Sequence, residues 1–169
     1  MKVWTIYLIF LSILLGACSS HTPGEVVDEF QGIIVYGNGS VSSTHGRHTT
    51  EDGYNLGLKW QCVEFVKRYY LEKLNHKMPE TWGHARDYFK AGVKEGEMNF
   101  DRALRQFPNG SQTSPRVGDI LIMDGWWFNK FGHVAIISEV KEDQIKIVQQ
   151  NKSSSRETMK LEKRNGEYW

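Results

Sequence analysis

A cysteine and a histidine far apart in this chain have the types and settings of a nucleophile and its general base. Cys62 stands where a glycine-containing polar loop gives way to a segment of helical periodicity, and His133 opens an apolar, β-rich run. The positive end of a helix lowers the pKa of a thiol, and an imidazole can take the thiol proton and return it to a leaving group. The pair predicts thiol-dependent catalysis. The alternative is that Cys62 is a small buried hydrophobe, the usual state of a lone free cysteine.

A histidine base needs a partner that fixes the orientation of its ring, and two amide side chains are placed for that role. Residues 144–151 follow the His133 strand after a short charged turn, which predicts an antiparallel hairpin. The end of the second strand would lie beside the start of the first, with Gln149 and Asn151 on the same face. Either side-chain oxygen can accept the imidazole N–H, as the third member of a catalytic triad does.

The elements that must position these side chains change in character along the chain. Apolar residues within 61–75 recur at three- and four-residue steps and predict a helix, and 82–91 is expected to form a second one. The segment 37–57 is dense in Gly, Ser, Thr and Asn and is expected to be a loop. Short β-branched or apolar runs occupy 31–36, 118–123, 133–140, 144–150 and 158–163. Helices followed by antiparallel strands are typical of an α+β fold.

The first residues predict export. Lys2 precedes an almost wholly apolar stretch, residues 3–15, which is shorter than the roughly 20 residues of a membrane-spanning helix and fits a signal peptide. Small residues before Cys18 resemble a bacterial lipobox, in which Cys18 becomes diacylated once residues 1–17 are removed. An uncleaved anchor, or an ordinary signal peptide with a coincidental cysteine, is the alternative.

The lipobox defines the expected domains and location. Residues 18–30 would be a polar tether and 31–169 the catalytic domain of a lipoprotein in the cell envelope, attached to the membrane through Cys18. Ser19 is not the aspartate typical of inner-membrane retention, so in a Gram-negative host we expect the outer membrane, facing the periplasm. Cys62 would then be an unpaired thiol in an oxidising compartment, which catalysis explains.

Composition narrows the partners and cofactors. Loss of Lys2 with the signal peptide leaves 20 basic against 20 acidic side chains. The mature chain thus has no excess of positive charge, and we expect no nucleic-acid binding. The 152 remaining residues suit one compact domain. The six histidines lack metal-ligand spacing, so we expect no zinc site, and no cofactor is indicated.

Two other groups of side chains have more than one interpretation. Trp126 and Trp127 precede the histidine strand and belong either to the core or to the wall of a substrate groove, since exposed aromatics usually mark binding surfaces. Glu64, Lys67 and Arg68 are most simply the solvated face of the predicted helix.

Four motifs, in order, resemble those of one family. They are Lys59-Trp60-Gln61-Cys62-Val63-Glu64-Phe65, Phe107-Pro108-Asn109-Gly110-Ser111, Gly132-His133-Val134-Ala135-Ile136-Ile137 and Gln149-Gln150-Asn151. Together they resemble the CHAP (cysteine, histidine-dependent amidohydrolase/peptidase) domain, and most of all the amidase domain of bifunctional glutathionylspermidine synthetase/amidase. The resemblance implies a papain-like fold, with N-terminal helices packed on an antiparallel sheet. It also implies hydrolysis of a C–N amide bond through a Cys62 thioester, with His133 as general base and acid.

The resemblance extends to two further positions. Gln61 matches the family position that helps form the oxyanion site with the Cys62 backbone N–H. The family's third residue is usually a glutamate, and this chain has Gln149 there. An amide can accept the imidazole N–H but lacks the charge that stabilises imidazolium, so the orienting residue is either Gln149 or Asn151.

Three functions are compatible with these residues. The first is a lipid-anchored amidase or endopeptidase acting on peptidoglycan peptides, because export would place the domain beside the cell wall. The second is cleavage of an amide that joins a glutathione-type peptide to a polyamine, which the nearer resemblance favours. The third is a catalytically inactive binding lipoprotein, suggested by Gln149 in place of the family's carboxylate.

Overall fold

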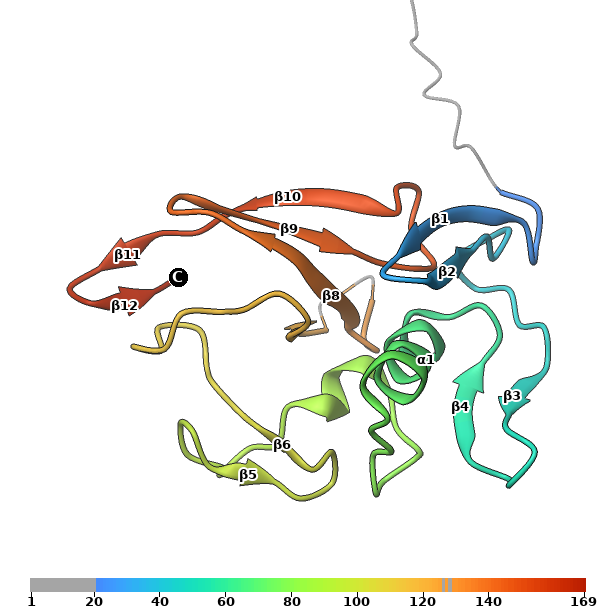
Figure 1. Cartoon of the computed structure of the whole chain (residues 1–169), viewed down its shortest axis with the longest axis horizontal. Coiled ribbons are helices and arrows are strands. Elements are labelled where there is room, and N and C mark those ends of the chain that lie inside the picture. Colours follow the sequence, from blue (N-terminus) through green and yellow to red (C-terminus); the bar gives the residue numbers. More distant parts are fainter. Residues whose placement is uncertain (1–20, 126, 128) are drawn as a thin grey trace, which may run out of the picture.

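The described part of the chain folds into an α-helix packed against antiparallel strands (Figure 1). The computed structural model describes residues 21–125, 127 and 129–169. The predicted signal peptide, Cys18 and Trp126 therefore lie outside the described residues. Among the helices that are described, none has the length and apolar character needed to cross a bilayer.

The helix α1 (Cys62–Leu74) forms where the apolar spacing predicted it. Phe65 and Tyr69 lie on its buried face, where their burial stabilises the helix against the sheet. The backbone of Gln61 is extended, and Asn75 ends the helix in a left-handed conformation. Cys62 is thus the first helical residue, where backbone N–H groups have no partner within the helix.

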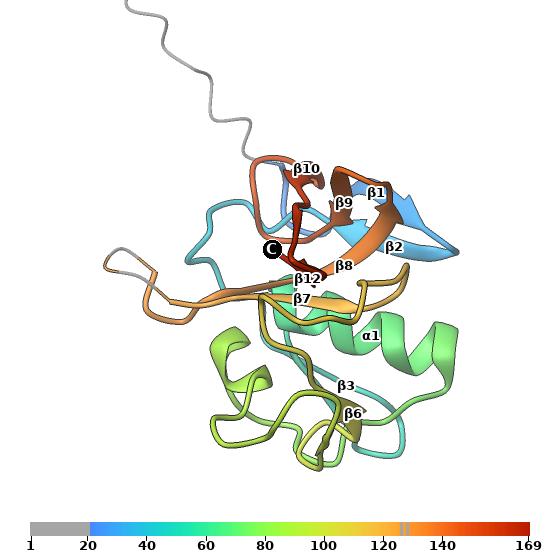
Figure 2. The same cartoon turned by 90° about the vertical axis from the view of Figure 1, so that its left-hand side faces the viewer.

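Four strands form the central sheet, in the order β10 (Arg156–Lys160), β9 (Gln144–Val148), β8 (His133–Val140) and β7 (Ile120–Met123). All neighbours are antiparallel, so the predicted hairpin of β8 and β9 is confirmed. Met123 pairs with His133, and Ile136 pairs with Val148. The end of β9 therefore lies beside the start of β8, and β7 and β8 pass over α1 (Figure 2).

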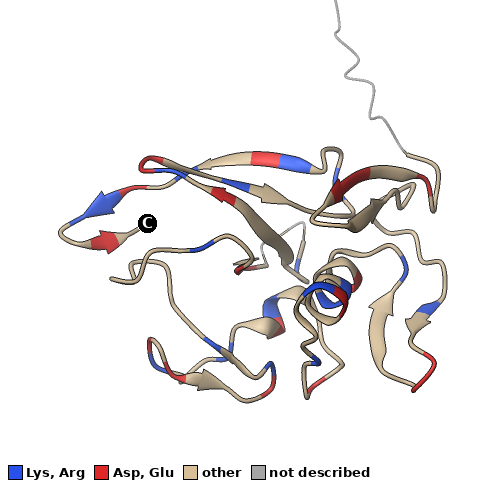
Figure 3. Cartoon of the chain, in the orientation of Figure 1, with Lys and Arg blue, Asp and Glu red and all other residues tan. Residues whose placement is uncertain are grey.

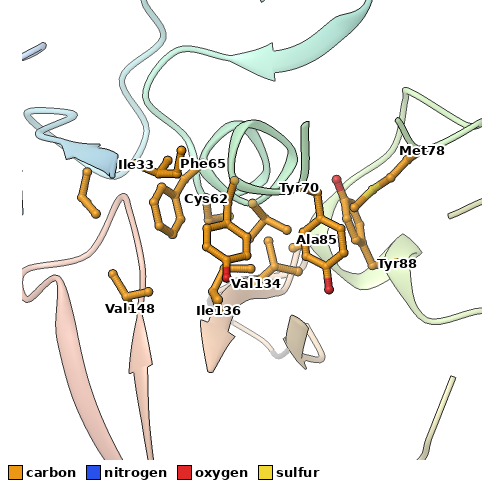
Figure 4. Close-up of a cluster of buried hydrophobic side chains, with 13 residues drawn as sticks. Ile33, Cys62, Phe65, Tyr70, Met78, Ala85, Tyr88, Val134, Ile136 and Val148 are labelled. Carbon is orange, nitrogen blue, oxygen red and sulfur yellow. The ribbon is translucent and has the colours of Figure 1, made fainter. Parts of the chain in front are cut away.

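Alternation along β8 divides the core between the two faces of the sheet. Val134 and Ile136 pack in the cluster that contains Cys62 and the buried face of α1 (Figure 4). Ala135 and Ile137 pack on the opposite face. Because both faces of the sheet are covered here, residues 134–137 of β8 form a continuous apolar run without polar alternation. The residue after His133 thus contacts the cluster that holds the cysteine.

Eight further strands and a 3₁₀ helix complete the described elements: β1 (Val26–Phe30), β2 (Ile33–Tyr36), β3 (Arg47–Thr49), β4 (Asn55–Leu58), η1 (Ala85–Tyr88), β5 (Met98–Asn99), β6 (Leu104–Arg105), β11 (Lys163–Arg164) and β12 (Glu167–Tyr168). The strands form two-stranded antiparallel sheets, β1–β2, β3–β4, β5–β6 and β11–β12. One helix with antiparallel strands fits the predicted α+β class. Strands precede the helix as well as follow it, however, so the expected order of helices first is wrong.

Two predictions from local sequence are corrected by the structure. The expected loop 37–57 contains the hairpin β3–β4, whose first strand is polar and short and so lacks an apolar signal. The helix expected over 82–91 is reduced to η1, a single turn. The carboxylate of Asp87 accepts the backbone N–H of His84 at 2.7 Å and closes that turn, and the backbone is extended again at Phe89.

The folded domain begins before residue 31. Val26–Phe30 pairs with Ile33–Tyr36, and Arg156 of β10 donates from Nε to the carboxylate of Asp28 at 2.6 Å. These contacts make residues 26–30 part of the folded domain, which was expected to begin at residue 31.

Charges of both signs are interspersed along α1 and the strands (Figure 3). The face of α1 that was expected to be solvated is buried, with exposed fractions of 0% for Glu64, 1% for Lys67 and 4% for Arg68. Lys67 donates to the carbonyl of Thr81 at 3.0 Å and also to that of Asn55. Burial lowers the pKa of Lys67 to about 8. This face therefore belongs to the interior, where each charge needs a partner.

Candidate active site

The Cys62 sulfur lies at the N-terminal end of α1, against the start of β8. Backbone N–H groups of Val134, Val63 and Cys62 itself approach the sulfur, and Figure 4 shows Cys62 near Val134. Only 8% of Cys62 is exposed. Burial raises the pKa of the thiol and outweighs the opposing effect of the three N–H groups. The lowered pKa expected from the helix end alone is wrong, because burial of Cys62 in the assembled core has the larger effect.

His133 is buried at the first position of β8. The preceding Gly132 has a φ of 74°, and a Cβ there would lie 2.7 Å from the carbonyl oxygen of Met123. Only glycine fits this entry into the strand. Burial lowers the pKa of His133 to about 4, helped by the charge of Lys152 and opposed by the hydrogen bond to Gln149. The imidazole is therefore neutral at pH 7.

Gln149 determines which nitrogen of His133 carries the proton. The Gln149 amide nitrogen Nε2 donates to the carbonyl of Ser154 at 3.1 Å and to the carboxylate of Glu157 at 3.2 Å, and both groups only accept. This fixes the amide with its oxygen toward His133, whose Nε2 is 2.9 Å from Gln149 Oε1. His133 Nε2 must then donate, and Nδ1 is left as the basic nitrogen.

Asn151 does not reach the histidine. Its φ of 64° is left-handed, which breaks the strand alternation that was expected to place it on the face of Gln149. Asn151 donates to the carbonyl of Val41 at 3.0 Å and to Gln61 Oε1, and its oxygen accepts from Asn38 Nδ2 at 2.8 Å. Of the two expected orienting residues, the structure brings only Gln149 to His133.

Gln61 immediately precedes the cysteine, as an oxyanion residue would. Its side-chain nitrogen donates to the carbonyls of Ser43 at 2.8 Å and Val41 at 3.3 Å. The amide hydrogens are therefore occupied by the loop at 41–43, and an oxyanion would have to replace one of these carbonyls. The side chain of Gln61 does not cap the start of α1. The Cys62 backbone N–H at this helix end is therefore the more direct donor to an oxyanion.

The structure describes only one of the two tryptophans expected at the substrate site. Trp126 is outside the described residues. Trp127 lies on the β7–β8 loop and is 92% exposed, so it is not a core residue.

Beside that loop is a cavity of about 300 Å³, lined by Arg86, Phe89, Ala91, Ile122 and Asp124. Ile122 pairs with Val134, which places the cavity one strand away from the Cys62 sulfur. Sequence reasoning missed these lining residues because none belongs to a recognisable motif. Within residues 21–125, 127 and 129–169, no three His, Cys, Asp or Glu side chains gather in a way that would hold a metal ion.

A comparison with protein-family models identifies the family. The model that describes the CHAP domain matches residues 52–151, more than half of the 169-residue chain, and this span contains Cys62, His133 and Gln149. The chain belongs to the CHAP family.

Curated relatives of this CHAP protein are larger enzymes. It is 38% identical over 108 residues to the bifunctional glutathionylspermidine synthetase/amidase of Escherichia coli (strain K12), covering 62% of this chain and 17% of the relative. It is 29% identical over 139 residues to the trypanothione synthetase of Crithidia fasciculata, covering 79% of this chain and 21% of the relative. The matches thus span about a fifth of these relatives.

If this site is catalytic, turnover should persist to a lower pH than an ordinary histidine base allows. Neutral His133 remains the main form down to its pKa of about 4, so the acid limb of kcat/KM should lie near that pH. Protonation of His133 below that pH removes the base, and activity falls.

Lys152→Gln should move the acid limb to higher pH, because the charge of Lys152 lowers the pKa of His133. Lys146→Gln is the control, since Lys146 pairs with Glu139 at 2.7 Å. A wild-type limb near the ordinary 6.5 would contradict this account.

Proposed function

We propose that this CHAP protein is a cysteine amidohydrolase that cleaves C–N amide bonds through a thioester on Cys62. Family membership, together with similarity to a relative named as an amidase, supports an amidohydrolase in general. The cysteine-dependent step rests on one geometric observation, the 2.9 Å contact of His133 Nε2 with Gln149 Oε1. That contact leaves Nδ1 of His133 as the basic nitrogen. The backbone N–H of the next residue, Val134, approaches the Cys62 sulfur. In this proposal the arrangement is papain-like, with the nucleophile on a helix and the base on the sheet packed against it.

The proposed reaction has two halves. The Cys62 sulfur attacks the amide carbonyl carbon while its proton passes to His133 Nδ1, and the oxyanion forms beside the Cys62 N–H. The C–N bond then breaks, and His133 returns the proton to the departing amine. In the second half, water loses a proton to His133 and attacks the thioester. The C–S bond breaks, the acid leaves, and the proton returns to the sulfur.

We propose peptidoglycan peptides as the substrate class. The predicted signal peptide and lipidated Cys18 would hold the domain in the cell envelope, attached to the membrane and beside the wall. The cavity next to the site carries Arg86 and Asp124, a cation and an anion for a peptide with charged groups of both signs. Trp127 on the same loop offers an exposed aromatic surface for substrate.

A second candidate substrate is a small amide between a glutathione-type peptide and a polyamine. The observation that favours it is the 38% identity to glutathionylspermidine synthetase/amidase. A catalytically inactive binding lipoprotein remains the non-enzymatic alternative, suggested by Gln149 where a carboxylate was expected.

One experiment distinguishes the three functions. The purified full-length protein is incubated in parallel with peptidoglycan fragments and with a glutathione–polyamine amide, and the products are identified by mass spectrometry. We expect new carboxyl and amine ends in the peptidoglycan fragments and none with the Cys62→Ser variant. Preferential cleavage of the polyamine amide would favour the second candidate. Absence of cleavage in both reactions would favour a binding protein.

Removal of the predicted lipid site should change location without changing the fold. Cys18→Ala should release the protein from membranes, because stable anchoring needs more than one acyl chain and this cysteine is the expected attachment point. Membrane fractionation measures this, and Ser20→Ala is a matched control that should stay bound. A Cys18→Ala protein that remains in the membrane fraction would reject the lipobox.

A further inference from the structure

The buried carboxylate of Glu64 is the centre of a hydrogen-bond network that the proposed reaction does not use. It accepts hydrogen bonds from His48 Nδ1 at 2.8 Å, Arg68 Nε at 2.7 Å and Gln150 Nε2 at 2.8 Å. Burial by itself would raise the pKa of Glu64, but the hydrogen bond from His48 and the Arg68 guanidinium lower it below its ordinary value. Glu64 is therefore a charged acceptor held in one place by three donors.

Gln150 connects this carboxylate to the candidate active site. Its side chain is 1% exposed and fully bonded: Oε1 accepts the backbone N–H of Tyr36 at 2.8 Å, and Nε2 donates both to Glu64 and to the carbonyl of Gln61 at 3.0 Å. Gln61 is the residue before the nucleophile. One amide thus joins β2, the start of α1 and the chain that follows β9.

The position of Gln150 in the sequence makes this connection relevant to catalysis. Its neighbour Gln149 orients His133, and its neighbour Asn151 holds the side chain of Gln61. The strand end that sets the imidazole is therefore bonded directly to the peptide that precedes the sulfur. A shift between these segments would separate the nucleophile from its base, and a misplacement of about 1 Å can cost on the order of 10²-fold in rate.

We propose that Glu64 and Gln150 are positioning residues, which hold the Gln149–His133 pair in register with Cys62. The proposal rests on the proposed function and deepens it. Stability alone is a weak explanation for the network, because buried ion pairs often contribute little net stability compared with apolar replacements. A positioning role has a different signature, a loss of kcat that exceeds what the loss of stability explains.

Gln150→Leu tests this with a matched control. The substitution removes three hydrogen bonds at Gln150, and Gln106→Leu removes a comparable set elsewhere. Gln106 is 5% exposed, accepts from the Lys90 N–H at 2.8 Å and Asn99 Nδ2 at 3.1 Å, and donates to the Lys90 carbonyl at 3.0 Å. Gln150→Leu should lose more stability, because one of its bonds is to the buried Glu64 carboxylate, so kcat is compared at a temperature where unfolding curves show both variants folded. Only Gln150→Leu should lower kcat, by roughly 10- to 100-fold with little change in KM.

A second measurement does not require substrate. Nitrogen NMR of His133 reports which ring nitrogen carries the proton; the wild type and Gln106→Leu should show a single Nε2–H form, and Gln150→Leu a mixture. Glu64→Gln, which keeps the side-chain shape, should act in the same direction if circular dichroism shows it folded. Equal kcat losses in the two leucine variants, or an unchanged tautomer in Gln150→Leu, would overturn the positioning role. A wild type without amide hydrolysis but with the expected NMR change would instead reject the proposed function and leave the positioning role supported.

Discussion

Cys62→Ser and His133→Ala should each abolish amide hydrolysis, with a fall of at least about 10³-fold in kcat. Cys62 supplies the sulfur that forms the thioester, and His133 supplies the nitrogen that takes its proton. The double variant should be hardly slower than either single variant, because residues that act in one step are strongly non-additive. Hydrolysis of one amide substrate by the three purified variants measures this.

The control is structural. Cys62 and His133 are both buried, at 8% and 6% exposure, so each variant needs a thermal unfolding curve beside its rate. Ser154→Ala, a substitution at an exposed position whose backbone carbonyl is retained, should keep wild-type activity. If the losses of the two single variants multiply in the double variant, the residues are not partners in one step.

Gln149→Ala should have the next largest effect, lowering kcat on the order of 10²-fold with a smaller change in KM. The Gln149 oxygen accepts from His133 Nε2, and its removal frees the imidazole to adopt the wrong tautomer. Asn151→Ala should be milder, because Asn151 contacts Gln61 and the carbonyl of Val41 and does not reach His133. Steady-state kinetics on both variants compare them directly, and a larger defect for Asn151→Ala would reverse the assignment.

The same geometry explains why a glutamine can stand where the family usually has a glutamate. The Gln149 amide accepts from His133 and donates to Glu157, which a carboxylate cannot do. Gln149→Glu would place a second carboxylate beside that of Glu157, about as close as the present 3.2 Å contact. This variant by itself should therefore gain little activity. Combined with Glu157→Gln, it should raise the pKa of His133, because a neighbouring negative charge favours imidazolium.

The elements with strong local signals were predictable from sequence. Helix α1 and the hairpin β8–β9 follow apolar periodicity, and this pairing alone brings the end of β9 to His133. The choice between Gln149 and Asn151 was not predictable, because alternation holds only within a strand and Asn151 is left-handed beyond the end of β9. The prediction of a helix over 82–91 was wrong because the Asp87 side chain closes a single turn, which the periodicity of apolar residues does not detect.

The charged face of α1 shows a second limit of local patterns. Glu64 and Arg68 have the spacing of a solvated i,i+4 ion pair, and this pair does form at 2.7 Å. The burial of this pair depends on segments distant in sequence. Gln150 donates to the Glu64 carboxylate, and the carbonyl of Ile34 accepts from Arg68 at 2.8 Å. The direction of the Cys62 pKa was missed for the same reason, since burial by the assembled core outweighs the helix end.

The most direct test of the central claim is a search for the acyl-enzyme. The full-length protein is quenched with acid during turnover of an excess of amide substrate, and its intact mass and digested peptides are measured. We expect a population heavier by the acyl group, with the added mass on the peptide that contains Cys62, sensitive to hydroxylamine and absent in Cys62→Ser. Undiminished hydrolysis by Cys62→Ser would contradict a thioester mechanism, as would an acyl group that maps to a different residue.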